Sequence, residues 1–134
     1  MKYLTSAIII KDKKMLLVYN IKHEKVRIET PGGKIEENET PEECAARESF
    51  EELGIKIRVK ELLGKYGTNT PEGYFESYMF ITEIVEGEPE VKAPDEISKF
   101  GWYSKEEIEE FIDKGLLVPN LIVAFEDLKK KNLI

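Results

Sequence analysis

Residues 33–55, GKIEENETPEECAARESFEELGI, decide the fold of this chain. Thr40 carries the short hydroxyl side chain that is favoured at a helix N-cap, and Glu43, three residues on, completes a capping box. Gly54 supplies a typical helix stop. The stretch therefore predicts a loop followed by one well-capped helix over residues 40–53.

This predicted helix carries an excess of negative charge. On a helical wheel with Glu48 at 0°, Glu52 falls at about 40° and Glu51 at about 300°, so the three carboxylates share one arc. Phe50 and Leu53 fall on the other side, where the wheel predicts the core. Like charges at this spacing, near a helix C-terminus, are unfavourable. The pattern leaves two interpretations open: a solvated acidic face, or a site for a divalent cation that prefers oxygen ligands.

The rest of the chain is predicted to form strands and two more helices. Apolar, β-branched runs predict strands, whereas capping boxes and glycine stops mark helices. Residues 31–33, Pro-Gly-Gly, are expected to interrupt regular structure. Because helices and strands do not alternate regularly, the order indicates an α/β fold with a mixed sheet. The predicted strands cover residues 3–10, 15–19, 26–30, 55–66, 74–85 and 100–103, and the later helices 104–114 and 121–131.

The composition predicts one globular domain over residues 1–134. With 27 acidic and 20 basic side chains, the net charge is −7, which argues against a nucleic-acid polymer as partner but permits a small phosphorylated ligand. No apolar run approaches the roughly 20 residues that span a bilayer, so no membrane partner is expected. The single cysteine and the absence of a signal-peptide pattern indicate a cytoplasmic location.

The fixed positions of residues 33–55 resemble the Nudix box, the signature of the Nudix hydrolase family. Ser49 stands where that family usually has an apolar residue, and every fixed polar or glycine position is filled. These positions are Gly33, Glu39, Arg47, Glu48, Glu51, Glu52 and Gly54. The resemblance implies an α/β/α sandwich with a mixed β-sheet.

The resemblance also implies a pyrophosphohydrolase that uses Mg²⁺ or Mn²⁺ and acts on a small nucleotide. It implies catalytic roles for Arg47, Glu48, Glu51 and Glu52, and metal binding by Glu48, Glu51, Glu52, the Gly32 carbonyl and Glu96 from a loop outside the box. The resemblance implies structural roles for Gly33, Glu39 and Gly54. It also implies that Arg47 ties the loop before the helix, residues 33–39 (the box loop), to the helix. Many relatives are dimers, so the resemblance allows a homodimer.

Three features bear on the substrate, and they disagree. Residues 29–36, ETPGGKIE, resemble MutT-like enzymes, which cleave nucleoside triphosphates to the monophosphate and pyrophosphate. Asn120 lies where those enzymes place a base-reading Asn, but it could equally cap the last helix. Pro71 lies near the offset at which relatives that cleave ADP-ribose or other ADP-sugars carry a proline, although an ordinary loop proline is favoured.

Basic side chains near the box complete the expected substrate site. Arg27, Lys34 and His23, together with Asn120, are the expected substrate-binding residues, although a solitary surface His usually has no special role. A non-catalytic nucleotide-binding module stays open as an alternative. Such modules usually lose box carboxylates, and this chain keeps them.

Overall fold

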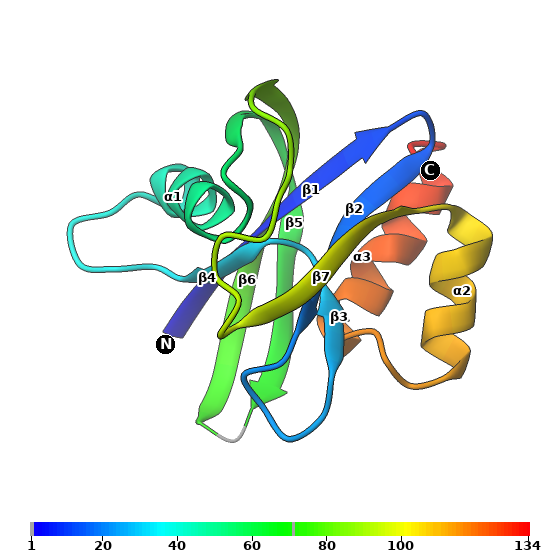
Figure 1. Ribbon diagram of the computed structural model, residues 1–134. Coiled ribbons are helices and arrows are strands. Elements are labelled where there is room, and N and C mark those ends of the chain that lie inside the picture. Colours follow the sequence, from blue (N-terminus) through cyan, green and yellow to red (C-terminus); the bar gives the residue numbers. More distant parts are fainter. Residues whose placement is uncertain (1, 71) are drawn as a thin grey trace.

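The computed structural model describes residues 2–70 and 72–134 (Figure 1). Pro71, the basis of the ADP-ribose signal, lies outside the described residues. The elements in chain order are β1 (Lys2–Lys11), β2 (Lys14–Asn20), β3 (Arg27–Glu29), β4 (Gly32–Lys34), α1 (Pro41–Leu53), β5 (Lys56–Thr70), β6 (Gly73–Glu86), β7 (Ile97–Tyr103), α2 (Lys105–Asp113) and α3 (Pro119–Lys130). No helix in the described part of the chain is long and apolar enough to cross a membrane.

Strand β1 is the centre of a mixed sheet with the order β3-β2-β1-β6-β5. It runs parallel to β6 and antiparallel to β2 and to the short β4. Strands β1 and β2 form a hairpin, and its two-residue turn has positive φ at both Asp12 and Lys13, as a tight hairpin requires. Strands β5 and β6 form a long antiparallel hairpin, and β7 pairs with β2.

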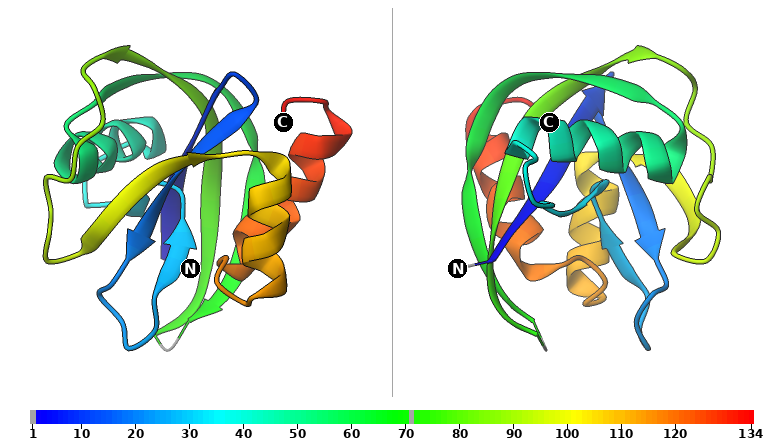
Figure 2. Two further views of the ribbon diagram at one scale, coloured as in Figure 1. Left: turned by 45° about the vertical axis from the view of Figure 1, so that its right-hand side comes forward. Right: turned by 90° about the vertical axis from the view of Figure 1, so that its left-hand side faces the viewer.

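Alternation along β1 divides the core between the two faces of the sheet. Ala7 and Ile9 pack with Leu53 on the α1 side. Ile8, between them, points to the other face and joins the cluster that includes Phe125 of α3. Figure 2 shows α1 on one side of the sheet and α2 and α3 on the other. The expected α/β/α sandwich is therefore confirmed.

Helix α1 presents a different face to the sheet from the one the wheel predicts. Phe50 is 53% exposed, so the prediction that it lies in the core is wrong. Small side chains allow α1 to lie close to β1 and β4, which a large ring would prevent, and hydrophobicity alone does not show this. The buried residues of α1 are Cys44, Ala45, Ser49, Glu52 and Leu53. Glu52 therefore lies in the middle of the buried arc.

The glycine pair also behaves differently from the prediction. Instead of interrupting regular structure, Gly32 and Gly33 belong to β4 and pair with Ser6 and Thr5 of β1. A side chain at Gly32 would clash with the carbonyl oxygen of Thr5, so only glycine permits this approach. The pairing fixes the loop that leads into α1.

Candidate active site

A cleft of about 1230 Å³ opens at one end of the sheet. Its walls come from β1, the β2–β3 loop, β3, β4, the tip of the β5–β6 hairpin and the segment that leads into α3. The structure brings several expected site residues to this cleft, namely His23, Arg27, Gly32, Gly33, Lys34, Glu48, Glu96 and Asn120. Arg47, Glu51, Glu52, Glu39 and Gly54 do not line it.

The three carboxylates of α1 occupy different environments. The Glu51 side chain is 52% exposed and the Glu48 side chain 19%, while Glu52 as a residue is only 6% exposed. Glu48 lies directly against β4, because a Cβ at Gly33 would be 2.7 Å from the Glu48 carboxyl carbon. Glu48 and Glu52 therefore form the inner pair, and Glu51 faces solvent.

The inner pair strongly favours the neutral form of one carboxyl group. Burial raises the pKa of Glu52 well above its usual range, and the hydrogen bond and negative charge of Glu48 raise it further. The charge of Glu29 acts in the same direction, while a backbone hydrogen bond from Gly32 acts against it. Two carboxylates held this close share a proton or need a cation.

Arg47 connects the loop, the helix and the carboxylates. Its Nε donates to Glu39 Oε2 at 2.6 Å and its Nη2 to Glu39 Oε1 at 3.0 Å. Its Nη1 donates to Glu48 at 2.9 Å and to Glu51 at 3.1 Å, and its Nη2 reaches the carbonyl of Lys34 at 3.3 Å. The guanidinium holds the pKa of Glu39 down, to about 2. Arg47 thus fastens the box loop to α1.

The donor set fits a hard divalent cation. Carboxylate oxygens are the ligands Mg²⁺ prefers, and a cation would neutralise the Glu48–Glu52 repulsion that burial enforces. Within residues 2–70 and 72–134, however, no three Asp, Glu, His or Cys side chains already converge as a ligand set. Arg47 is the cation that contacts Glu48 and Glu51 in this arrangement. A metal at Glu48 would therefore compete with Arg47.

The expected substrate residues surround the cleft from two sides. Lys34 pairs with Glu72 near the hairpin tip at 2.5 Å, and its ammonium lies 5.6 Å from the centre of the Phe75 ring. Asn120 is 8% exposed and lines the cleft. The alternative that Asn120 caps α3 is wrong, because the N-cap is Val118 and makes no side-chain cap bond. Glu96 lines the cleft but pairs with Lys22 at 3.8 Å.

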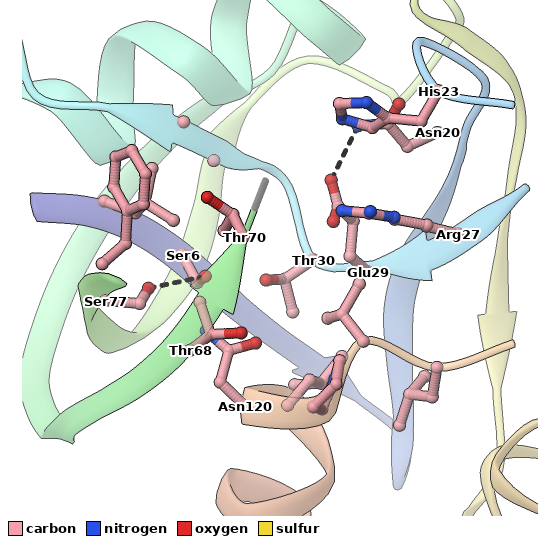
Figure 3. A pocket seen from close by; sticks show the side chains of 18 of the residues that line it. Ser6, Asn20, His23, Arg27, Glu29, Thr30, Thr68, Thr70, Ser77 and Asn120 are labelled. Atoms are coloured by element: carbon pink, nitrogen blue, oxygen red, sulfur yellow. Dashed lines mark hydrogen bonds between the residues drawn. The ribbon is translucent and has the colours of Figure 1, made fainter. Parts of the chain in front are cut away.

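Glu29 is a site residue that the sequence analysis does not single out. Asn20 Nδ2 donates to Glu29 Oε1 at 2.8 Å, and both side chains line the cleft (Figure 3). Burial raises the pKa of Glu29, against the lowering effect of the Asn20 bond and of nearby basic groups. Its position at the end of a predicted strand, just before Pro-Gly-Gly, was the signal that could have revealed it.

Hydroxyl and amide side chains from β1, β5, β6 and α3 form one part of the cleft lining, which is called its floor below. Ser6 and Ser77, on the adjacent strands β1 and β6, have their hydroxyl oxygens 3.2 Å apart. Thr68 and Asn120 line the same cleft (Figure 3). The floor is neutral and can both donate and accept hydrogen bonds, in contrast to the charged groups around it.

The sequence matches the NUDIX domain family over residues 2–121. A NUDIX hydrolase from Nitrosomonas europaea superimposes with a TM-score of 0.86 at 24% identity, over 97% of this chain and 89% of that chain. A MutT NUDIX hydrolase from Burkholderia pseudomallei superimposes with a TM-score of 0.84 at 25% identity, over 95% and 97%. The chain therefore belongs to the NUDIX family.

Two relatives in sequence carry different substrate names. An ADP-ribose pyrophosphatase from Methanocaldococcus jannaschii is 40% identical over 92 residues, which are 66% of this chain and 53% of that protein. An 8-oxo-dGTP diphosphatase from Escherichia coli is 40% identical over 63 residues, 47% of this chain and 49% of that protein. The matched segments thus span about half the length of each relative.

Proposed function

We propose that this protein is a metal-dependent pyrophosphohydrolase that acts on a nucleoside diphosphate linked to another group. The observation that carries the proposal is the Glu48–Glu52 pair. Glu48 lies against Gly33 and lines the cleft, and Glu52 is buried next to it. A bound Mg²⁺ or Mn²⁺ supplies neutralisation of phosphate charge and a more acidic water. Glu48 and Glu52, the Gly32 carbonyl and the outer Glu51 are the proposed metal-binding groups.

The substrate proposed first is a nucleoside triphosphate, cleaved in the MutT-like manner. Water adds across the phosphoanhydride bond between the α and β phosphates, giving the nucleoside monophosphate and pyrophosphate. Lys34 and Arg27 would bind phosphate oxygens, with His23 nearby, because cationic donors make strong hydrogen bonds to phosphate. Asn120 would read the base from the neutral floor of the cleft, since an amide both donates and accepts.

A second candidate is cleavage of ADP-ribose or another ADP-sugar. The relative from M. jannaschii favours it, because that ADP-ribose pyrophosphatase matches a longer segment than the 8-oxo-dGTP diphosphatase does. The volume of the cleft, about 1230 Å³, exceeds the usual upper range for small-ligand pockets, roughly 1,000 Å³, so it leaves room for a second sugar.

Product analysis separates these candidates. The purified chain is incubated with Mg²⁺ or Mn²⁺ and with the common nucleoside triphosphates, 8-oxo-dGTP, ADP-ribose and ADP-glucose, and the products are identified by chromatography. Release of monophosphate and pyrophosphate from one triphosphate supports the first candidate, and faster cleavage of ADP-ribose supports the second. Nucleotide binding without turnover would favour a non-catalytic module. We also propose that the protein is cytoplasmic and forms a homodimer. Size-exclusion chromatography with light scattering tests the homodimer.

A further inference from the structure

The Glu29 carboxylate is partly buried, and a neutral amide is its hydrogen-bond partner. It lies at the end of β3 in the wall of the cleft, and its Oε1 accepts from Asn20 at 2.8 Å. Among the described residues, no basic side chain lies within 4.0 Å of either carboxylate oxygen, and Oε2 accepts no hydrogen bond from protein. A partly buried carboxylate without an ion pair is costly unless another cation binds nearby.

The chain leads directly from Glu29 to the inner pair. Gly32, three residues further on, lines the same cleft. Gly33 lies against the Glu48 carboxyl group. The negative charge of Glu29 also acts on Glu52. Glu29 therefore lines the same cleft as Glu48, the member of the inner pair that lines it.

Asn20 fixes the direction of Glu29. The backbone N–H of Lys22 donates to Asn20 Oδ1 at 2.9 Å, which leaves Nδ2 to donate to Glu29. Asn20 is 8% exposed and lies at a register shift of β2, between β3 and β7. A neutral amide, rather than a cation, thus orients this carboxylate, and the basic side chains of Lys22, Arg27 and His23 act on it without forming an ion pair.

Glu96 is less suited to the same task. Its side chain is 45% exposed and already pairs with Lys22 at 3.8 Å. We propose that Glu29, positioned by Asn20, is the carboxylate from outside residues 33–55 that binds the metal ion. The sequence analysis assigns this role to Glu96. This inference rests on the proposed function, because it assumes that the Glu48–Glu52 pair binds a divalent cation.

Manganese binding tests the proposal without any turnover. The free Mn²⁺ signal in electron paramagnetic resonance gives the affinity of the parent chain and of Glu29→Gln, Asn20→Ala, Glu96→Gln and Glu52→Gln. Glu24→Gln, the same change in the exposed β2–β3 loop, is the matched control. Replacing a group that supports a metal site typically changes the metal affinity 10–100-fold, so Glu29→Gln should bind Mn²⁺ at least tenfold more weakly than the parent chain does. Asn20→Ala should also bind more weakly, and Glu24→Gln should match the parent.

Three results would overturn the inference, and they are distinguishable. Parent-like affinity in Glu29→Gln excludes its role directly. Weakened binding in Glu96→Gln with parent-like binding in Glu29→Gln returns the role to Glu96. If the parent binds Mn²⁺ no better than Glu52→Gln does, the proposed metal site itself fails, and this inference fails with it. Circular dichroism and thermal unfolding confirm that each variant is folded, and Asn20→Ala gives an independent result if Glu29→Gln does not fold.

Discussion

Arg47 donates two parallel hydrogen bonds to Glu39, Nε to Oε2 at 2.6 Å and Nη2 to Oε1 at 3.0 Å, across the junction between the box loop and α1. The Glu39 side chain is 13% exposed and that of Arg47 25% exposed, so water competes little for either partner. The fork of a guanidinium matches a carboxylate in a way that an ammonium cannot. This contact determines where the loop enters the helix.

Replacing Arg47 should therefore lower stability even when its charge is kept. We expect Arg47→Lys and Arg47→Ala to lose about 1.5–3 kcal/mol of unfolding free energy, the usual size for hydrogen bonds to charged groups. Urea unfolding measures the loss. Arg58→Ala, which removes an exposed ion pair with Glu83, is the control and should change stability by less than about 1 kcal/mol. A fully stable Arg47→Lys variant would show that the fork is not needed.

The same contact predicts a dependence of stability on acid. Arg47 lowers the pKa of Glu39 from 4.5 to about 2 in the folded chain. A lowered folded pKa means that the stabilisation is complete above about pH 4.5 and is lost as the pH falls toward 2. Unfolding free energies measured across this window should fall less steeply in Glu39→Gln than in the parent. Parallel curves for the two proteins would contradict the assignment.

Divalent metal should stabilise the fold through the inner carboxylate pair. We expect millimolar Mg²⁺ or Mn²⁺ to raise the melting temperature more than monovalent salt of equal ionic strength, because the native state binds the ion better than the unfolded chain does. The rise should shrink in Glu48→Gln and Glu52→Gln. Glu42→Gln, exposed on the same helix, is the control. Equal responses in all variants would indicate diffuse screening.

A side chain at Gly33 should displace the Glu48 carboxyl group rather than disrupt the fold. A Cβ there would lie 2.7 Å from the Glu48 carboxyl carbon, so Gly33→Ala should push Glu48 away while the fold persists. We expect Gly33→Ala to lose most of its metal-dependent rise in melting temperature. In a double-mutant cycle with Glu48→Gln, the two losses should be far from additive, because both act on one carboxylate. Additive losses would place the effect of Gly33 elsewhere.

Asn120 should affect the choice of base more than the rate of cleavage. If it reads the base, Asn120→Ala should raise KM for the preferred nucleotide by about 5–150-fold, equivalent to roughly 1–3 kcal/mol for a well-formed amide contact to a base edge. The value of kcat should change much less. Steady-state kinetics over the nucleotide panel measures both, and a loss that is equal for every base would remove Asn120 from base recognition.

The sequence predicts the local features of the fold better than the orientation of its parts. The capping box of Thr40 and Glu43 depends on neighbouring residues, and the structure contains both of its hydrogen bonds. The rotation of α1 depends on what β1 and β4 present to it, so hydrophobicity alone placed Phe50 inside. For the same reason Glu52 was expected to face away from the core, although it lies in the middle of the buried face.

The cleft shows the same limit. The spacing of the box carboxylates lies within one helix and is visible in the sequence. The contact of Asn20 with Glu29 joins two strands, and whether Asn20 points to Glu29 or away depends on the register of β2 against β3. A register of this kind is set by strand pairing over the whole sheet. Sequence reasoning that treats each segment separately cannot supply it.

The parallel pairing of β1 with β6 has a consequence for how the chain folds. Lys2 lies beside Phe75 and Ile9 beside Thr82, so the pairing closes a loop of about 70 residues, whereas the β1–β2 and β5–β6 hairpins close locally. Contacts so distant in sequence form slowly, because the chain loses the entropy of loop closure before the contacts can stabilise it. We therefore expect the two hairpins to form first and the step that joins them to limit the rate of folding. Gly32 and Gly33 pair with β1, and Ser77 of β6 also lines the cleft, so we expect the cleft to be completed only when β6 joins β1.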